Sequence, residues 1–399
     1  MMFHRRILRA RSVCATVFSL PLFAALPTAN AAGTGPTSNA YNPALGLILS
    51  GTFGEFSHSP EEYNIAGYPL GGESEPGQEG FALGESELHI SANIDQSWYG
   101  AFTFAMANDE AAVENAYVQT TALGNGLTFR AGRFFSGVGY MNEQHAHSWQ
   151  FVDPSLAYRA LLGSQYGDDG VQIRWLAPLD VFTEFGAEWF NGSAFPAGGS
   201  AKHGTGSWSG FVHLGGDLGN SHSWRAGVSY LQANADARAS GDPDNPDLFD
   251  GRTHVAIADL VWKWAPGGNA ADRSLTLQAE YLRSRHSGSF TPAGNAAVSH
   301  TATSDGWYAQ AVYQFAPRWR AGLRHDALDA MPGNVALAGT ALDGQGHAPT
   351  RSSAMLDYSS SEFSRWRLQY NRDQSQAELD HQWLMQFTMS LGAHGAHTF

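Results

Sequence analysis

The feature that most constrains this chain is an alternation of apolar and polar side chains with a period of two residues. The clearest example is close to the C-terminus, where apolar residues occupy the odd positions: Trp383, Met385, Phe387, Met389 and Leu391. Alternation over about ten residues, repeated between turn residues, is typical of strands with one apolar and one polar face. No segment after residue 31 approaches the roughly 20 apolar residues of a membrane helix. If the chain crosses a membrane, it must do so as a closed barrel.

The alternating segments predict an all-β fold, a transmembrane antiparallel β-barrel of about 16 strands, which is an even number as in bacterial barrels. Short turns and long loops alternate, with the long loops on one side and both termini on the other. We expect long loops over 234–252 and 283–304, and the phase of the segment 113–121 is ambiguous. The 45 glycines and 12% aromatic residues agree with a barrel that has aromatic girdles.

The first residues have the pattern of a secretory signal peptide. Arg5, Arg6, Arg9 and Arg11 precede an apolar stretch, and Ala29-Asn30-Ala31 is a small-residue cleavage site. We therefore predict a signal peptide at 1–31 and a single barrel domain at 32–399. The only cysteine, Cys14, lies in the signal. The net charge of −14 disfavours nucleic acid as a partner.

The segment 133–165 interrupts the strands and is too apolar for a solvated loop. It contains Phe134, Phe135, Tyr140, Trp149, Phe151, Leu156, Tyr158, Leu161 and Leu162. Such side chains need a place to be buried, and the lumen offers one. We predict that this third extracellular loop folds inward and narrows a pore.

Charged residues of this loop and of the polar strand faces are the candidate site. For one side of the constriction we predict Arg133, Glu143, His145, His147, Asp153 and Arg159. For the pore wall we predict Arg130, Arg174, Arg320, Arg324, Glu85 and Glu87. The mixed signs are compatible with a polar, water-filled lumen or with a transverse field that orients solutes.

Two histidines at positions 145 and 147 point the same way if the segment is extended, and imidazole suits Zn²⁺. Glu143 or Asp153 is a candidate oxygen ligand. The alternative is that both histidines only form hydrogen bonds within the constriction, with no cofactor. For His394 and His397 a structural role is the favoured interpretation. No G-x-S-x-G, P-loop or dinucleotide motif occurs, so we predict that the chain is not an enzyme.

Several long segments resemble a family of Gram-negative outer-membrane proteins. They include GRFFSGVGYMNEQHAHSWQFVDPSLAYRALLGSQYGDDGVQIRWLAP (132–178), SEFSRWRLQYNRD (361–373) and SLGAHGAHTF (390–399). Members are described as porin-like, and sometimes as zinc-regulated TonB-dependent outer-membrane receptors. The resemblance implies the outer membrane, contact with its lipid, and recognition of the terminal Phe399 by the barrel assembly machinery.

From these observations we expect a porin-like channel for passive diffusion of small hydrophilic solutes, with a homotrimer as the analogous assembly. One alternative, which the family label implies, is a zinc-linked receptor or uptake protein. A TonB-dependent transporter needs a plug and about 22 strands, whereas the first strand is expected soon after the cleavage site. A second alternative is a structural or adhesive barrel with a closed lumen.

Overall fold

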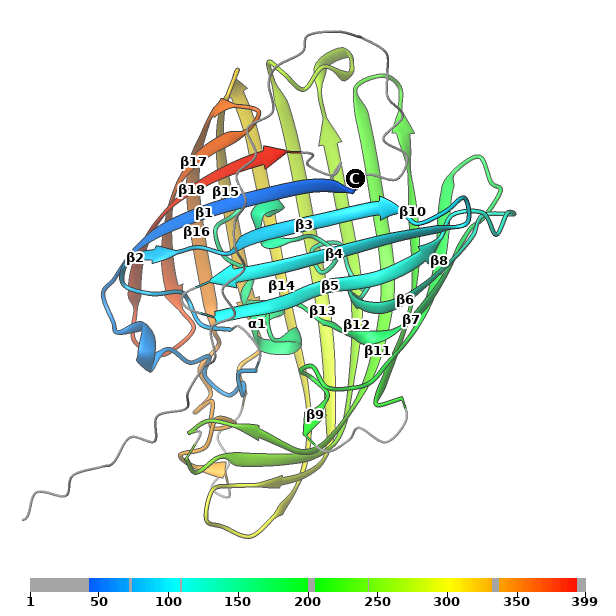
Figure 1. The fold of residues 1–399 in the computed structure, drawn as a ribbon. Helices are drawn as coiled ribbons and strands as arrows, with labels where there is room; N and C mark the ends of the chain where they lie inside the picture. Colours follow the sequence, from blue (N-terminus) through cyan, green and yellow to red (C-terminus); the bar gives the residue numbers. More distant parts are fainter. Residues whose placement is uncertain are drawn as a thin grey trace, which may run out of the picture. The chain divides into compact units, whose positions relative to one another are not determined.

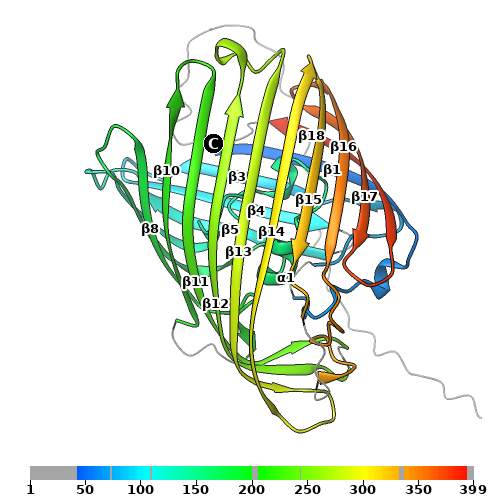
Figure 2. The same ribbon diagram turned by 180° about the vertical axis from the view of Figure 1, so that it is seen from behind.

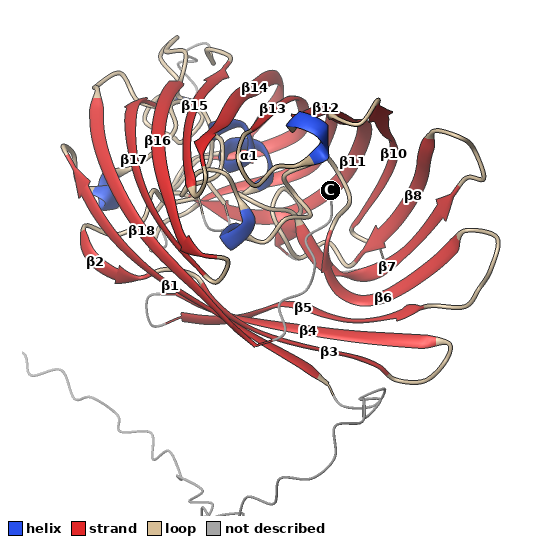
Figure 3. Ribbon diagram, turned by 90° about the horizontal axis from the view of Figure 1, so that it is seen from above, coloured by secondary structure: helices blue, strands red, loops and turns tan. Residues whose placement is uncertain are grey.

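The computed structural model describes residues 43–71, 74–107, 110–199, 205–242, 244–331 and 337–392. Its strands form an 18-stranded sheet in which strand β1 pairs with both β18 and β3. The sheet therefore closes on itself as a barrel, as the view along the barrel in Figure 3 shows. The predicted signal peptide, His394, His397 and Phe399 lie outside the described residues.

Two of these strands are short additions, β2 (Gly80–Leu83) and β9 (Gly198–Gly199). The wall consists of the remaining 16 strands, so the predicted strand number is confirmed. They are β1 (Ala44–Phe56), β3 (Ser86–Asn93), β4 (Trp98–Ala107), β5 (Glu110–Thr120), β6 (Leu127–Phe135), β7 (Gly167–Leu176), β8 (Phe182–Phe190), β10 (Ser207–Leu218), β11 (His222–Ser240), β12 (Asp247–Trp264), β13 (Ser274–Thr291), β14 (Val298–Ala316), β15 (Trp319–Leu328), β16 (Thr350–Ser361), β17 (Ser364–Gln374) and β18 (Asp380–Gly392).

The described helical segments are short. One is an α-helix, α1 (Leu156–Leu162), and three are 3₁₀ turns, η1 (Pro60–Glu62), η2 (Ala146–Ser148) and η3 (Pro266–Gly268). Among the residues described, no helix is long and apolar enough to cross a membrane.

The alternation sorts side chains between the two sides of the wall. On β17, Trp366 and Leu368 are exposed on the outer face, while Arg367 and Gln369 are buried on the inner face. Most of the other strands repeat this pattern, so the barrel has an apolar outside. Its inside is largely polar, except where Leu231, Val255, Ile257 and Leu282 belong to an apolar cluster with α1. An apolar outside and a polar inside are the arrangement a barrel needs when lipid surrounds it and water fills it.

Two predicted loops are largely strand. Strand β11 continues to Ser240 and β12 begins at Asp247, while β13 continues to Thr291 and β14 begins at Val298. These long hairpins lie side by side in Figure 2 and extend past their neighbours at the bottom of Figure 1. Their polar composition suggested loops. A hairpin needs no apolar outer face once it extends beyond the lipid, and backbone pairing alone maintains it.

Candidate functional site

Residues 136–166 join β6 to β7, and in Figure 3 the segment lies inside the ring of strands. We call it the lumen loop. Its two ends are tied together, because the Ser136 N–H donates to the Tyr166 carbonyl over 2.9 Å. The Asn142 side-chain amide also donates to the backbone carbonyls of Ser136 and Tyr166, over 2.8 Å each. The loop therefore leaves the wall and returns to it at two adjacent points, which these hydrogen bonds hold together.

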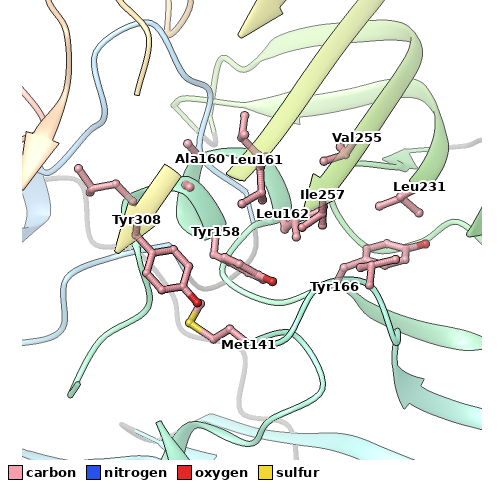
Figure 4. Packing of buried hydrophobic residues seen from close by; sticks show 14 of the residues in the cluster. Met141, Tyr158, Ala160, Leu161, Leu162, Tyr166, Leu231, Val255, Ile257 and Tyr308 are labelled. Atoms are coloured by element: carbon pink, nitrogen blue, oxygen red, sulfur yellow. The ribbon is translucent and has the colours of Figure 1, made fainter. Parts of the chain in front are cut away.

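The apolar side chains of the lumen loop pack against the inner wall. All residues of α1 are buried, and all except Arg159 share one cluster with Val255 and Ile257 of β12. Figure 4 shows Leu161 and Leu162 of α1 close to these wall residues. Burial removes this apolar surface from water, and that gain accounts for the loop's place in the lumen.

Local sequence sets the ends of α1. The Ser155 hydroxyl accepts from the Tyr158 N–H over 3.4 Å and caps the start of the helix. Gly163 follows the last turn with φ of 63°, a left-handed conformation that glycine adopts without strain. The helix is thus a single short element that presents its side chains to β13, β14 and β15.

Asp153 bonds the lumen loop to β15, β16 and β17. Its Oδ1 accepts from Arg324 over 2.6 Å and from Gln369 over 2.8 Å. Its Oδ2 accepts from Arg351 over 2.8 Å and from Asn371 over 3.1 Å. Burial alone would raise the pKa of Asp153, but Arg351 and Arg324 outweigh it and hold the pKa well below its usual range. The carboxylate is therefore ionised and fully bonded.

Two more charged residues extend this arrangement into a buried network. Asp326 Oδ2 accepts from the Nε atoms of Arg324 and Arg351 over 3.1 and 3.3 Å. Arg159 of α1 donates to Asp153 Oδ2 over 3.4 Å. Three guanidinium groups thus surround two carboxylates. A buried network of this kind needs all its members, because loss of one leaves an uncompensated charge.

Two wall glutamates bind the backbone of the first half of the lumen loop. Glu280 of β13 accepts from the N–H groups of Tyr140 and Met141, each over 3.0 Å, and from the Tyr158 hydroxyl over 2.7 Å. Glu188 of β8 accepts from the Gly137 N–H over 2.9 Å. These buried carboxylates satisfy loop groups that would otherwise lack partners.

Glu143 pairs with Arg174 of β7, which also lies 3.5 Å from Glu184 of β8. Burial alone would raise the pKa of Glu143, but the nearby Arg174 outweighs it and lowers the pKa to about 2. Glu143 is therefore a charge partner of the wall. This position, and that of Asp153 among the arginines, corrects the suggestion that either residue supplies an oxygen ligand to the histidines.

The two loop histidines face β3 and β5. His145 Nδ1 lies 2.8 Å from Glu114 Oε2 and 3.2 Å from Glu87 Oε2. His147 Nδ1 donates to the other oxygen of Glu87, Oε1, over 2.6 Å. The Asn115 side-chain amide lies 2.9 Å from His145 Nε2. Burial would lower the pKa of His145, but its bonds to Glu114 and Glu87 raise it to about 10.

A β-bulge places Glu114 in this group. Thr103 of β4 pairs with Asn115, but the next residue, Phe104, pairs with Val113, so that Glu114 has no partner across the ladder. An extra residue of this kind re-aims side chains, and here the neighbours Glu114 and Asn115 both reach His145. The bulge also explains the ambiguous phase of the segment 113–121.

The structure brings together most of the predicted site residues. Glu143, His145, His147, Asp153 and Arg159 all belong to the lumen loop. Arg130, Arg174, Arg320, Arg324 and Glu87 lie on strands and turn inward. Glu85 immediately precedes β3 and is half-buried.

Arg133 does not join them, and its predicted place in the constriction is wrong. It lies on β6 in the same phase as Leu127, which faces outward, and its Nε donates to Asp169 Oδ1 over 2.7 Å. Both side chains are about half exposed, at 42% and 53%. The strand continues through Arg133 to Phe135, so the loop starts later than the apolar sequence suggested.

One half of the lumen is rich in cations. Near the short-turn ends of the described strands the inward phase includes Arg130, Arg174, Arg225, Lys263, Arg320, Arg365 and Arg367. The acidic residues there are fewer, namely Glu184, Asp217 and Asp357, with Glu143 of the loop. Arg365 donates to the backbone carbonyl of His147 over 2.7 Å rather than to an acid. The positive charge at this end is therefore only partly neutralised.

Sequence comparison found one similar protein and no matching family model. A protein of Aquifex aeolicus (strain VF5), described as uncharacterized, is 29% identical over 392 residues, which cover 91% of this chain and 81% of that protein.

The similar solved structures are outer-membrane barrels. OmpT of Vibrio cholerae in its trimer form has a TM-score of 0.53 at 10% identity and covers 88% of this chain and 99% of its own. An anion-selective porin from Comamonas acidovorans gives the same values. The channel DcaP of Acinetobacter baumannii has a TM-score of 0.51 at 11% identity, covering 88% and 97%. The chain thus has the fold of outer-membrane porin and channel barrels.

Proposed function

We propose that this protein is an outer-membrane channel, not an enzyme, through which small hydrophilic solutes diffuse passively. The observation that carries the proposal is the largely polar inner wall of a closed 16-strand barrel with a loop packed and bonded into its lumen. A barrel of this size normally encloses an aqueous passage, and a loop fixed inside it would restrict the solutes by size. The lipid of the outer membrane would contact the apolar outer face.

We further propose that the channel prefers anions. The cation-rich half of the lumen supports this, because any solute that passes the lumen loop meets several arginines there. Guanidinium groups bind carboxylates and phosphates through paired N–H donors. A similarity to an anion-selective porin of another bacterium agrees with this preference.

The test is single-channel recording of the refolded protein in a planar bilayer. A KCl gradient across the bilayer gives a reversal potential whose sign reports the preferred ion. We expect open channels with a reversal potential of the anion-selective sign. No conductance under any condition would favour a closed structural barrel, and a cation-selective sign would reject the anion preference.

Two variants test whether the inward arginines of the wall cause the anion preference. Changing Arg225 and Arg320 together to Gln removes inward charge and should move the reversal potential toward zero. The matched control is Arg133→Gln, which removes a charge from the outer face. It should leave the reversal potential unchanged, because the barrel wall separates this charge from the lumen and Asp169 pairs with it.

We also propose a homotrimer, by analogy with the trimer form of OmpT. Chemical cross-linking of the protein in native membranes, followed by mass determination, should give a band of three chains. A monomer band alone would reject this assembly.

A further inference from the structure

One cluster in the lumen plays no part in the proposed anion preference. Glu87, Glu114 and His145 bring two carboxylate oxygens and an imidazole nitrogen within 4.8 Å of one another. The three residues come from β3, β5 and the lumen loop, so nothing local in the sequence accounts for their meeting. The side chains of His145 and Glu114 are 24% and 12% exposed, which leaves access for a small ion.

We propose that Glu87, Glu114 and His145 bind one divalent transition-metal ion between the lumen loop and the wall. Imidazole with carboxylates suits Zn²⁺ and its neighbours in the transition series, whereas Ca²⁺ and Mg²⁺ take oxygen ligands only. Three protein ligands leave a further position for water or a solute.

The distances fit such an ion. Ligands of a tetrahedral Zn²⁺ with bonds of about 2.0 Å lie about 3.3 Å apart. His145 Nδ1 is 2.8 Å from the Glu114 oxygen and 3.2 Å from the Glu87 oxygen. An increase of a few tenths of an ångström in the two His145 distances, with all three atoms within 4.8 Å of one another, admits the ion, which then takes the place of the proton between these atoms.

The surroundings provide the outer partners that metal sites use. His147 donates to the second oxygen of Glu87 over 2.6 Å and so orients that carboxylate. The Asn115 amide lies 2.9 Å from His145 Nε2, and with its oxygen turned to the ring it accepts that N–H and fixes the tautomer. The bulge that aims Glu114 inward completes the set. His147 is thus an outer partner in this proposal, not a ligand.

The experiment measures Zn²⁺ bound per chain by equilibrium dialysis on the refolded full chain, and the visible absorption of the Co²⁺ form. The background carries His394→Ala and His397→Ala, so that this second histidine pair of the sequence cannot contribute to the metal count. We expect one Zn²⁺ per chain and Co²⁺ bands of a low-symmetry site with nitrogen and oxygen ligands. Absence of binding at micromolar free Zn²⁺ would overturn the proposal.

Variants separate a metal site from a plain hydrogen-bonded anchor. Glu114→Gln keeps the size and the hydrogen-bond acceptor but removes the charged ligand, and His145→Gln removes the nitrogen. Each should weaken Zn²⁺ binding by more than the roughly 10–100-fold that loss of an outer partner costs. His147→Gln should weaken it by that smaller factor. Equal affinity of Glu114→Gln and the parent would reject the site.

The matched control is Glu184→Gln, which alters another glutamate bonded to a lumen histidine, His213, at 3.2 Å. It should leave Zn²⁺ binding unchanged, because Arg174 already occupies the neighbourhood of that carboxylate. Each variant is first shown to be folded by its β-sheet circular dichroism. Metal binding is read independently of conductance, so a closed lumen and an absent metal site give different results.

Discussion

Arg351 Nη1 on β16 lies 2.8 Å from Asp153 Oδ2 in the lumen loop, which joins two residues 198 positions apart. Both side chains are almost fully buried. In lipid-surrounded barrels the wall is held by backbone pairing, but a loop in the lumen has no strand partner. Side-chain bonds of this kind therefore hold the loop in place together with the apolar packing of α1.

We expect Asp153→Asn to release the lumen loop. The substitution removes one of the two carboxylates that Arg324 and Arg351 share, and breaking a buried pair costs about 3–5 kcal/mol. Urea unfolding of the protein in lipid vesicles should show this loss, and the single-channel conductance should rise or fluctuate. Asp169→Asn, which affects an exposed pair on the outer face, should change the unfolding free energy by less than about 1 kcal/mol.

Asp153 should also make the free energy of unfolding depend on pH. The pKa of Asp153 is lower in the folded chain than its unfolded value of about 3.9. Its contribution to stability is therefore complete above that value and is lost as the pH falls below it. The difference in unfolding free energy between the parent and Asp153→Asn should be constant from about pH 7 to about pH 5 and shrink toward about pH 3. A difference that stayed constant down to the lowest pH would contradict this.

The structure shows why the barrel fold could be predicted from the sequence and why the contacts of the lumen loop could not. Alternation is a local signal, and it gave the barrel, the strand number and the inward phase of Arg174 and Arg324. The aromatic loop was visible as apolar sequence with no strand pattern. The partners of Asp153 could not be predicted, because Arg351 and Gln369 depend on strand register far along the chain. Glu114 was missed because a bulge reverses its phase.

Leu162→Ala should loosen α1 from the wall. The side chain is fully buried, and large-to-small changes at such positions cost about 2–5 kcal/mol. Limited proteolysis of the barrel in detergent should then cut within 136–166, where the parent resists. The matched control is Leu260→Ala on the outer face, where the side chain is 52% exposed. It should leave the lumen loop protected, and cleavage of both variants at equal rates would contradict the packing role of α1.

Glu280→Gln should disturb the loop without changing the size of the side chain. Both oxygens of Glu280 accept hydrogen bonds, Oε1 from the Met141 N–H and Oε2 from the Tyr140 N–H, each over 3.0 Å. An amide has only one acceptor oxygen, so one loop N–H faces another donor and loses its partner. A buried group without a partner costs about 1–3 kcal/mol. Urea unfolding in vesicles measures this, with Glu55→Gln on an exposed part of β1 as the neutral control. Equal losses in the two variants would mean that Glu280 does not hold the loop.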